Sequence, residues 1–337
     1  MEKLVILGNS PAGVKVIEEM RVRKYTGEIA LLGFEGFYPY RRELFPDFLA
    51  KEIPEDQLFC QPPEFYSQNQ VEVLLEHTVE KINFKKRRLV TNQEAEISYD
   101  FLLITDSQER RFSQIKGATK QGVYTAATLT EIKGMLKTLA LVDTVVVETT
   151  TPTGLRLAHA LKTHDKEVIL IVPTAYLLSD WVDESMAANI QKHLESQGVR
   201  VICDNAIVEL LGDSQVKALR LKSGKVLASQ MVVFPEARPD LKAFAESGLE
   251  LWKQEAILVD LGLRTSVDRV YATDCVVCLK DDTRLSRFSC LQELEEQGVV
   301  VARQILGEDA QFVSSLPPLT INLSSVPISL EKFSLSK

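Results

Sequence analysis

The sequence predicts an α/β fold because a strand–turn–helix–strand unit occurs twice along the chain. The elements are expected at residues 4–7, 8–13, 14–23 and 28–32 in the first copy, and at residues 144–147, 148–154, 155–163 and 168–172 in the second. Short apolar strands joined by a helix of this length form parallel pairs with a right-handed crossover. The repeat therefore predicts two parallel-sheet domains of similar architecture.

Further elements follow the second unit. Strands are expected at residues 199–203, 206–210, 216–221, 231–234, 257–259, 270–272, 319–323 and 326–330, and a helix at residues 291–306. The chain has 337 residues, of which 45% are hydrophobic and 26% are charged. This length and composition are typical of a globular protein with two or three domains and a large core.

The formal net charge is −8, which does not favour binding to nucleic acids or acidic membranes. The densest basic run, Lys85–Arg88, is interpreted as the solvated end of a hairpin. No apolar run has the length of a membrane span, and the run at residues 4–7 is too short for a signal peptide. The five cysteines are unevenly placed and do not suggest a disulfide framework. A cytoplasmic location is the simplest expectation.

The first turn reads Gly8-Asn9-Ser10-Pro11-Ala12-Gly13, close to the G-x-G-x-x-G pattern that binds dinucleotides between a strand and a helix. Gly8 permits the tight turn, Gly13 lets the helix pack on the strand, and the helix N-terminus supplies amides to phosphates. Ser10 replaces the middle glycine with another small residue. Glu35 follows the second strand, where an acid would bind ribose hydroxyls. An ordinary strand-to-helix turn is the alternative interpretation.

Motif-like stretches are spread over residues 1–330. They are Gly8–Gly13, Tyr38–Pro46, Tyr99–Thr105, Arg238–Asp240, Arg264–Asp274 and Glu296–Gly298. Together they resemble the FAD-dependent pyridine nucleotide–disulfide oxidoreductase superfamily, in the branch of NADH:rubredoxin oxidoreductases and the flavin-binding part of nitrite reductase. The corresponding segments of that branch read PYxRPxLP, YDxLLIATG, GxRPN and QTSVPxIYAAGD.

The resemblance implies two Rossmann-like three-layer dinucleotide-binding domains, one inserted in the other. Residues 1–110 and 239–312 would form the FAD-binding domain, residues 111–238 a NAD-like domain, and residues 313–337 the remnant of a C-terminal domain. The chemistry of the family is hydride transfer from NAD(P)H to the flavin, followed by transfer of electrons to an acceptor. A redox protein or the subunits of a complex are therefore expected as partners.

The resemblance also implies a set of FAD-binding residues. Arg42 would lie near the flavin or its phosphates, Val79 would contact the adenine through its backbone, and Asp274 would bind the ribityl chain or the pyrophosphate. The remaining candidates in the same segments are Gly8, Ser10, Pro11, Ala12, Gly13, Glu35, Thr105 and Cys275. The segments ending at Thr105-Asp106 and at Asp274 each lack a glycine and are each expected to be one residue short.

The second turn, Thr149–Gly154, keeps only the last glycine of the pattern. Threonine is β-branched and tolerates a positive φ poorly, and Pro152 removes an amide donor at the start of the helix. Glu148 would repel a pyrophosphate, and the acid expected after the next strand is replaced around Val172. We therefore do not expect NAD(P)H to bind here and interpret the unit as a fold kept for packing. The alternative is that Thr149–Thr151 bind a phosphate in another manner.

The cysteines give no complete redox or metal site. Residues 38–50 hold no cysteine, which excludes the dithiol pair that some branches of the family carry. Cys275 and Cys278 form a CxxC at an expected helix start, with Cys290 further on. They are either small packing residues, which we favour, or a redox pair or metal ligands, for which the set is incomplete. No metal site is expected and no catalytic acid or base is identified.

These observations favour an FAD-binding oxidoreductase, or an electron-transfer flavoprotein subunit, that passes electrons between FAD and a protein partner. A non-catalytic structural or regulatory subunit that keeps the fold is the alternative, because several glycines of the motifs are lost. A third hypothesis is a reductase that still uses NADH. The fold alone does not decide among them.

Overall fold

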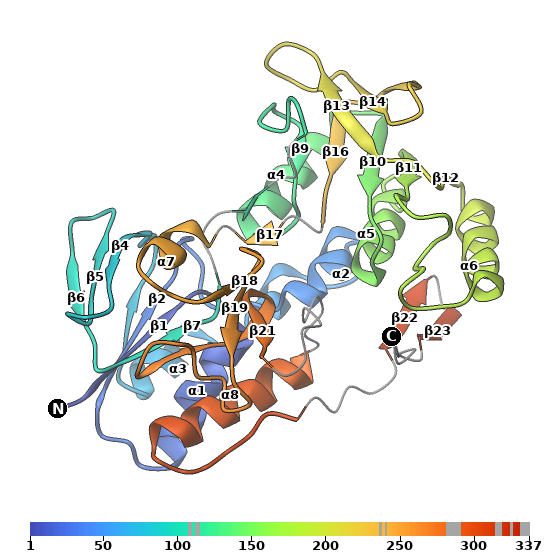
Figure 1. Cartoon of the computed structure of the whole chain (residues 1–337). Helices are drawn as coiled ribbons and strands as arrows, with labels where there is room; N and C mark the ends of the chain where they lie inside the picture. The colour runs from blue at the N-terminus through green and yellow to red at the C-terminus, as the bar shows by residue number, and fades with distance from the viewer. Residues whose placement is uncertain are drawn as a thin grey trace. The chain divides into compact units, whose positions relative to one another are not determined.

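The computed structural model describes residues 1–106, 110–111, 115–235, 238–239, 241–280, 291–313, 319–323 and 326–330 (Figure 1). The chain forms two compact units. Unit 1 consists of Met1–Arg41, Asp56–Arg111 and Arg238–Ser315, and unit 2 consists of Arg42–Glu55, Phe112–Ala237 and Leu316–Lys337. No helix among the described residues is long and apolar enough to cross a membrane.

Unit 1 is built on a five-stranded parallel sheet with the order β20-β7-β1-β2-β3. The strands are β1 (Lys3–Leu7), β2 (Glu28–Leu32), β3 (Val71–Leu74), β7 (Phe101–Ile104) and β20 (Val270–Ala272). Strands β1 and β7 lie inside the sheet and are buried almost throughout, as expected for a parallel sheet covered on both faces. The sheet therefore forms the centre of the unit 1 core.

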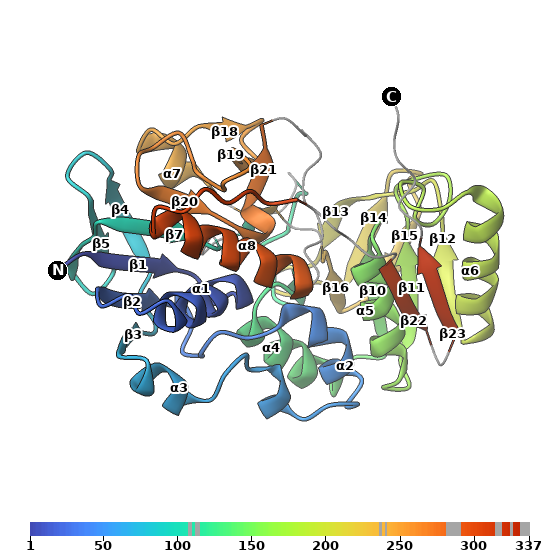
Figure 2. The ribbon, with the colours of Figure 1, turned by 90° about the horizontal axis from the view of Figure 1, so that it is seen from below.

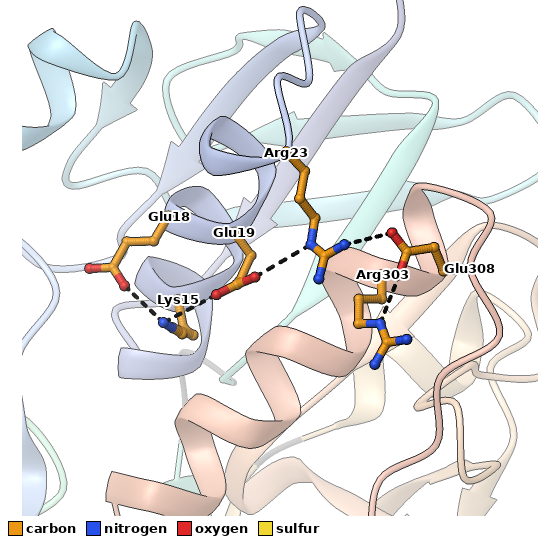
Figure 3. A network of polar contacts seen from close by, with 6 residues as sticks. All are labelled: Lys15, Glu18, Glu19, Arg23, Arg303 and Glu308. Atoms are coloured by element: carbon orange, nitrogen blue, oxygen red, sulfur yellow. Dashed lines mark hydrogen bonds and ion pairs between the residues drawn. The ribbon is translucent and has the colours of Figure 1, made fainter.

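Two helices of unit 1, α1 (Pro11–Val22) and α8 (Leu291–Ile305), lie side by side (Figure 2). Gly298 makes this close approach possible, because a Cβ atom there would lie 2.7 Å from the Ala12 carbonyl oxygen. Ion pairs add to the contact, because Glu308, which follows α8, binds both Arg303 of α8 and Arg23, the C-cap residue of α1 (Figure 3). Residues far apart in sequence are thus brought to one face of the sheet.

The rest of unit 1 is antiparallel or irregular. One three-stranded sheet is β4 (Val79–Asn83), β5 (Arg88–Thr91) and β6 (Glu96–Ser98), and another is β18 (Leu251–Trp252), β19 (Ala256–Val259) and β21 (Val277–Leu279). The remaining elements are η2 (Glu55–Leu58), α3 (Pro63–Gln68), β8 (Arg110–Arg111), β17 (Arg238–Pro239), α7 (Lys242–Glu246) and η3 (Asp274–Val276). Lys85 and Lys86 are exposed in the turn between β4 and β5, which confirms the expected hairpin end.

Unit 2 has its own five-stranded parallel sheet with the order β12-β11-β10-β16-β9. Four of its strands, β12, β11, β10 and β16, follow the arrangement of β3, β2, β1 and β7 in unit 1, whereas the edge strand β9 comes before them in the chain. The strands are β9 (Val123–Tyr124), β10 (Thr144–Glu148), β11 (Glu167–Ile171), β12 (Val199–Ile202) and β16 (Met231–Val233). Helices α4 (Leu129–Leu139), α5 (Pro152–Lys162) and α6 (Glu184–Ser196) belong to this unit, as does a meander of β13 (Ile207–Leu211), β14 (Ala218–Leu221) and β15 (Val226–Ala228). The expected α/β fold with two Rossmann-like sheets is confirmed.

Residues 42–55 belong to unit 2, although the resemblance placed them in the first segment of the FAD-binding domain. This stretch contains η1 (Arg42–Leu44) and α2 (Phe45–Leu49). Arg156 of α5 holds it, because its guanidinium donates to the Glu43 carbonyl at 2.9 Å and to the Asp47 carboxylate at 2.7 Å. Unit 2 also contains the hairpin of β22 (Leu319–Leu323) and β23 (Val326–Leu330), at the residues expected for two strands.

Helices α1 and α5 both begin three residues earlier than their apolar spacing suggested. Ser10 and Thr151 are the N-cap residues, and each side chain accepts a hydrogen bond from a backbone N–H of the first turn. Pro11 and Pro152 follow at the first helical position, where the fixed φ of proline suits the helix and its missing N–H costs nothing. The cap therefore sets the start of each helix before its apolar face begins.

Candidate functional site

The turn between β1 and α1 has the backbone geometry that the glycine pattern predicts. Gly8 adopts φ +112°, and a Cβ atom there would lie 2.5 Å from the Thr105 hydroxyl oxygen and 2.8 Å from the Asp106 Cβ atom. Gly13 faces the strand, because a Cβ atom there would lie 2.9 Å from Cγ2 of Ile6. Both positions therefore require glycine, one for the turn and one for the packing of α1 on β1.

Ser10 connects this turn to a segment more than two hundred residues away. Its hydroxyl oxygen accepts a hydrogen bond from the Ala12 N–H at 3.2 Å and donates one to the Asp274 carboxylate at 2.8 Å. Asp274 is 8% exposed, and its own N–H donates to Oε1 of Gln297 on α8 at 2.7 Å. The structure thus brings Ser10, Ala12 and Asp274 together at the N-terminus of α1.

The backbone of Asp274 has a conformation that is typical of glycine. Its φ of +68° lies in the left-handed region that glycine adopts most readily and that aspartate tolerates better than most residues. Cys275 follows Asp274 in η3, where only its backbone is described.

The expected helix start at the CxxC is wrong. Asp274–Val276 form a single 3₁₀ turn, and Val277 and Cys278 belong to β21, which pairs with β19. The β-branched run at Val276-Val277 favours a strand over a helix. Cys278 is buried in that strand, and Cys290 lies outside the described residues. Within the described part of the chain, no group of three cysteine, histidine or acidic side chains has the geometry of a metal site.

A cavity of about 460 Å³ opens beside the turn within unit 1. Its lining comes from the ends of β1, β2 and β7, the start of β4 and the helix α7, and consists of Leu7, Gly8, Leu32, Phe34, His77, Thr78, Val79, Glu80, Ile82, Asp106, Lys242, Ala243, Phe244 and Glu246. Val79 and Gly8, both expected in the FAD site, therefore line one cavity. Asp106 is 3% exposed and places a carboxylate against the turn.

Glu35 and Asn9 fix the loop that follows β2. Glu35 is 7% exposed, and its carboxylate accepts a hydrogen bond from the hydroxyl of the fully buried Tyr40. Asn9 is fully buried and donates from Nδ2 to the Phe37 carbonyl at 2.7 Å. Its Oδ1 atom has no hydrogen-bond partner among the described residues. Asn9, Tyr40 and Gln297 lie in the motif stretches of the sequence, but only the folded contacts identify what their side chains do.

The other candidates have simpler surroundings. Thr105 is fully buried, and its hydroxyl donates to the Leu7 carbonyl at 2.9 Å, which fixes the end of β1 beside β7. Pro11 and Ala12 are buried in the first turn of α1. Arg42 begins η1 in unit 2, so unit 1 does not by itself assemble it with the turn.

The equivalent turn of unit 2 is closed by its own side chains. The Thr149 hydroxyl oxygen accepts from the Thr151 N–H at 3.0 Å, and the Thr151 hydroxyl oxygen accepts from the Gly154 N–H at 3.3 Å. A Cβ atom on Gly154 would collide with the Thr149 side chain. The Glu148 carboxylate accepts from the Ile207 N–H. A pyrophosphate binding at this turn would have to displace the threonine hydroxyls from two backbone amides.

The strand order, the glycine-bounded turn and the cavity at the carboxyl ends of the strands define a Rossmann-like protein of the dinucleotide-binding class. The family model described as pyridine nucleotide-disulphide oxidoreductase matches residues 2–295, and the chain belongs to this family.

Two relatives from Bacillus subtilis (strain 168) are longer than this chain. The assimilatory nitrate reductase electron transfer subunit is 22% identical over 97% of the chain and 42% of its own length. The nitrite reductase [NAD(P)H] is 25% identical over 97% of the chain and 40% of its own length. The chain therefore spans about two fifths of these relatives. The rubredoxin-NAD(+) reductase of Pseudomonas putida is 26% identical over 94% of the chain and 85% of its own length.

Solved structures show the same fold. The covalent putidaredoxin reductase–putidaredoxin complex has a TM-score of 0.85 at 18% identity, covering 97% of this chain and 80% of that one. The water-forming NADH oxidase of Lactobacillus brevis, bound to NADH, has a TM-score of 0.86 at 15% identity, covering 96% and 74%. The expectation that NAD(P)H is not a donor finds no support in these comparisons, because several relatives are named for NADH, NAD(+) or NAD(P)H.

Proposed function

We propose that this chain is an FAD-binding electron-transfer protein that exchanges electrons with a redox-protein partner. The observation that carries the proposal is the turn at Gly8–Gly13, with its positive φ, its hydroxyl cap and the cavity beside it. A helix N-terminus behind a glycine turn is the usual site of a dinucleotide diphosphate in this fold.

The residues of unit 1 fit FAD. The first turn of α1 would hold the diphosphate, Glu35 would bind the ribose hydroxyls, and Val79 would contact the adenine in the cavity that it shares with Gly8. The buried Oδ1 atom of Asn9 and the buried hydroxyl of Thr273 find no partner among the described residues, so polar groups remain for a ligand. When bound, FAD supplies a carrier for hydride and single-electron transfer, while the protein positions it and excludes water.

The proposed redox partner and the proposed electron donor are inferred from the names of the relatives. Rubredoxin and ferredoxin stand in the names of several reductases that align with most of this chain. We therefore propose a small iron–sulfur protein as partner and NAD(P)H as the first electron donor to test. Arg42 and Cys275 remain candidates for residues that lie near the flavin. Electron transfer from NAD(P)H bound at unit 2 would require the closed turn of that unit to admit a dinucleotide.

A non-catalytic subunit is the second candidate, and two buried carboxylates favour it. Asp106 and Asp274 both lie at the turn that would hold the diphosphate, and each is at least 92% buried. Like charges at this place weaken the binding of an anionic cofactor. A chain that had lost the flavin would still keep the fold.

Equilibrium binding of FAD to the full chain separates the two candidates. The proposal predicts saturable quenching of FAD fluorescence with one FAD per chain, and a flavin absorbance band that NADH or a reduced ferredoxin bleaches without oxygen. A folded chain that binds no FAD at millimolar concentration would refute the electron-transfer function and leave the structural subunit as the better account.

A further inference from the structure

The side chain of Asp274, a residue of η3, lies at the N-terminus of α1, which is unusual for a residue from so distant a segment. Its backbone takes a left-handed φ of +68°, and the side chain is 8% exposed. A buried carboxylate needs strong partners to remain charged. It has one in Ser10, whose hydroxyl donates to it at 2.8 Å.

A continuous set of hydrogen bonds holds this carboxylate in place. Gln297 of α8 accepts from the Asp274 N–H at 2.7 Å and fixes the left-handed backbone. The Asp274 carboxylate accepts from Ser10, and the same Ser10 oxygen accepts from the Ala12 N–H at 3.2 Å. The hydroxyl of Ser10 therefore holds the carboxylate and Gln297 holds the backbone that carries it, and all three residues are buried.

The place that Asp274 occupies is favourable for any anion. The first-turn amides and the helix dipole give the N-terminus of α1 a partial positive charge, which stabilises a carboxylate there. The same charge stabilises the diphosphate of a dinucleotide in this fold. Because two anions cannot share one helix terminus without repulsion, the carboxylate and a diphosphate are competitors.

We propose that Asp274 is an internal anion that competes with the diphosphate of FAD for the N-terminus of α1, so that FAD binds only when the carboxylate leaves Ser10. This inference rests on the proposed FAD site and adds a residue that limits its occupancy. It differs from the role that the resemblance gives Asp274, in which the carboxylate would assist the binding of FAD.

Four proteins test the inference: the wild-type chain, Asp274→Asn, Asp274→Gly and Asp268→Asn. Asparagine keeps the size and tolerates the left-handed backbone, and glycine removes the side chain altogether. Asp268 is a matched control, because its side chain is 82% exposed and pairs with Arg87 at 3.2 Å, away from Ser10. The control removes the same unit of charge from unit 1. Circular dichroism checks the fold of every variant.

Dissociation constants are measured by fluorescence for FAD and by calorimetry for ADP and adenosine. We expect both Asp274 variants to bind FAD and ADP at least tenfold more tightly than the wild type, with adenosine unchanged because it carries no phosphate. Asp268→Asn should match the wild type. Equal or weaker FAD binding by Asp274→Asn and Asp274→Gly would overturn the competition and leave the FAD site standing. Absence of FAD binding in all four proteins would instead overturn the proposed function, and the competition with it.

Discussion

The turns at the start of α1 and α5 have matching ends and different middles. Both place a hydroxyl cap, a proline and a glycine in the same order, in Ser10-Pro11-Ala12-Gly13 and in Thr151-Pro152-Thr153-Gly154. Unit 1 begins its turn with Gly8 at φ +112°, next to a cavity, whereas unit 2 begins with the buried Thr149. The shared hydroxyl cap, proline and glycine are enough to start a helix. The first residue of the turn decides whether a cavity or a threonine side chain lies next to the helix N-terminus.

The comparison also shows a difference in what lies around the two capping hydroxyls. In unit 2, Thr149 and Thr151 give their hydroxyl oxygens to the amides of the turn itself. In unit 1, Ser10 likewise accepts from the Ala12 N–H, and its hydroxyl also donates to the Asp274 carboxylate of a distant segment. A hydroxyl inside the turn is part of the local backbone, whereas the carboxylate comes from a segment far away in the sequence. Unit 1 is therefore the better place for a removable anion.

The largest expected effect is that of Gly8→Ala. A Cβ atom at φ +112° would be strained and would also meet Thr105 and Asp106, so we expect the free energy of unfolding to fall by about 3 kcal/mol, the upper end of the cost of a strained backbone. Urea unfolding measures it. Gly224→Ala is the control, because Gly224 has φ +86° but no atom within 4 Å of its Cβ position. An equal loss of unfolding free energy in both variants would show that the contacts of the added Cβ atom with Thr105 and Asp106 do not contribute.

Alkaline pH should weaken unit 1 through Tyr99. Burial raises the pKa of Tyr99 to about 12, from an ordinary value of 10.0. Because the folded state holds the proton more tightly, this stability is complete below pH 10 and is lost as the pH rises from 10 to 12, by roughly 2 kcal/mol. Tyr99→Phe should lose less stability than the wild type over this range in urea unfolding. Parallel pH profiles would contradict the assignment to Tyr99.

Removal of the Thr149 hydroxyl should cost less and should affect unit 2 alone. Thr149→Val keeps the shape but leaves the buried Thr151 N–H without its acceptor, so we expect a loss of about 1–2 kcal/mol in unfolding free energy and no change in FAD affinity. Thr144→Val on β10, the strand that leads into this turn, is the control, because its hydroxyl bonds an exposed Glu167 carboxylate and its loss should cost less than about 0.5 kcal/mol. If Thr149→Val altered FAD affinity, the two turns would not be independent.

The smallest effect is expected at the ion pairs between α1 and α8. Glu308 binds Arg23 at 2.6 Å and Arg303 at 2.9 Å, and all three side chains are at least 34% exposed (Figure 3). Exposed pairs contribute little, so Glu308→Gln should cost about 0.5 kcal/mol in low salt and less in high salt. A loss that is large and independent of salt would mean that these charges hold the two helices together.

The sequence predicted the parts of the fold that depend on local pattern. The apolar strands at β1 and β10 and the glycine turn at Gly8 were recognisable because period, length and turn chemistry agreed. The helix starts were misplaced, since capping by Ser10 and Thr151 depends on a hydrogen bond that apolar spacing does not contain. The helix expected at Cys275 was wrong because strand pairing with β19 prevailed over the local pattern.

The candidate site was only partly predictable for a physical reason. Ser10 and Asp274 each belonged to a recognisable motif, but their contact joins residues 264 apart and follows from the packing of α8 on α1. The positive φ of Asp274 likewise depends on Gln297, which no turn pattern marks. The motif letters therefore could not show that Asp274 adopts a left-handed backbone.

The most direct test of the central claim is hydrogen–deuterium exchange of the full chain with and without saturating FAD. The account predicts that FAD slows the exchange of amides in the turn and first helical residues at 8–16, and leaves residues 149–157 unchanged. Protection confined to residues 149–157, or unchanged exchange at 8–16 in a chain that binds FAD, would contradict the assignment of the FAD site to unit 1.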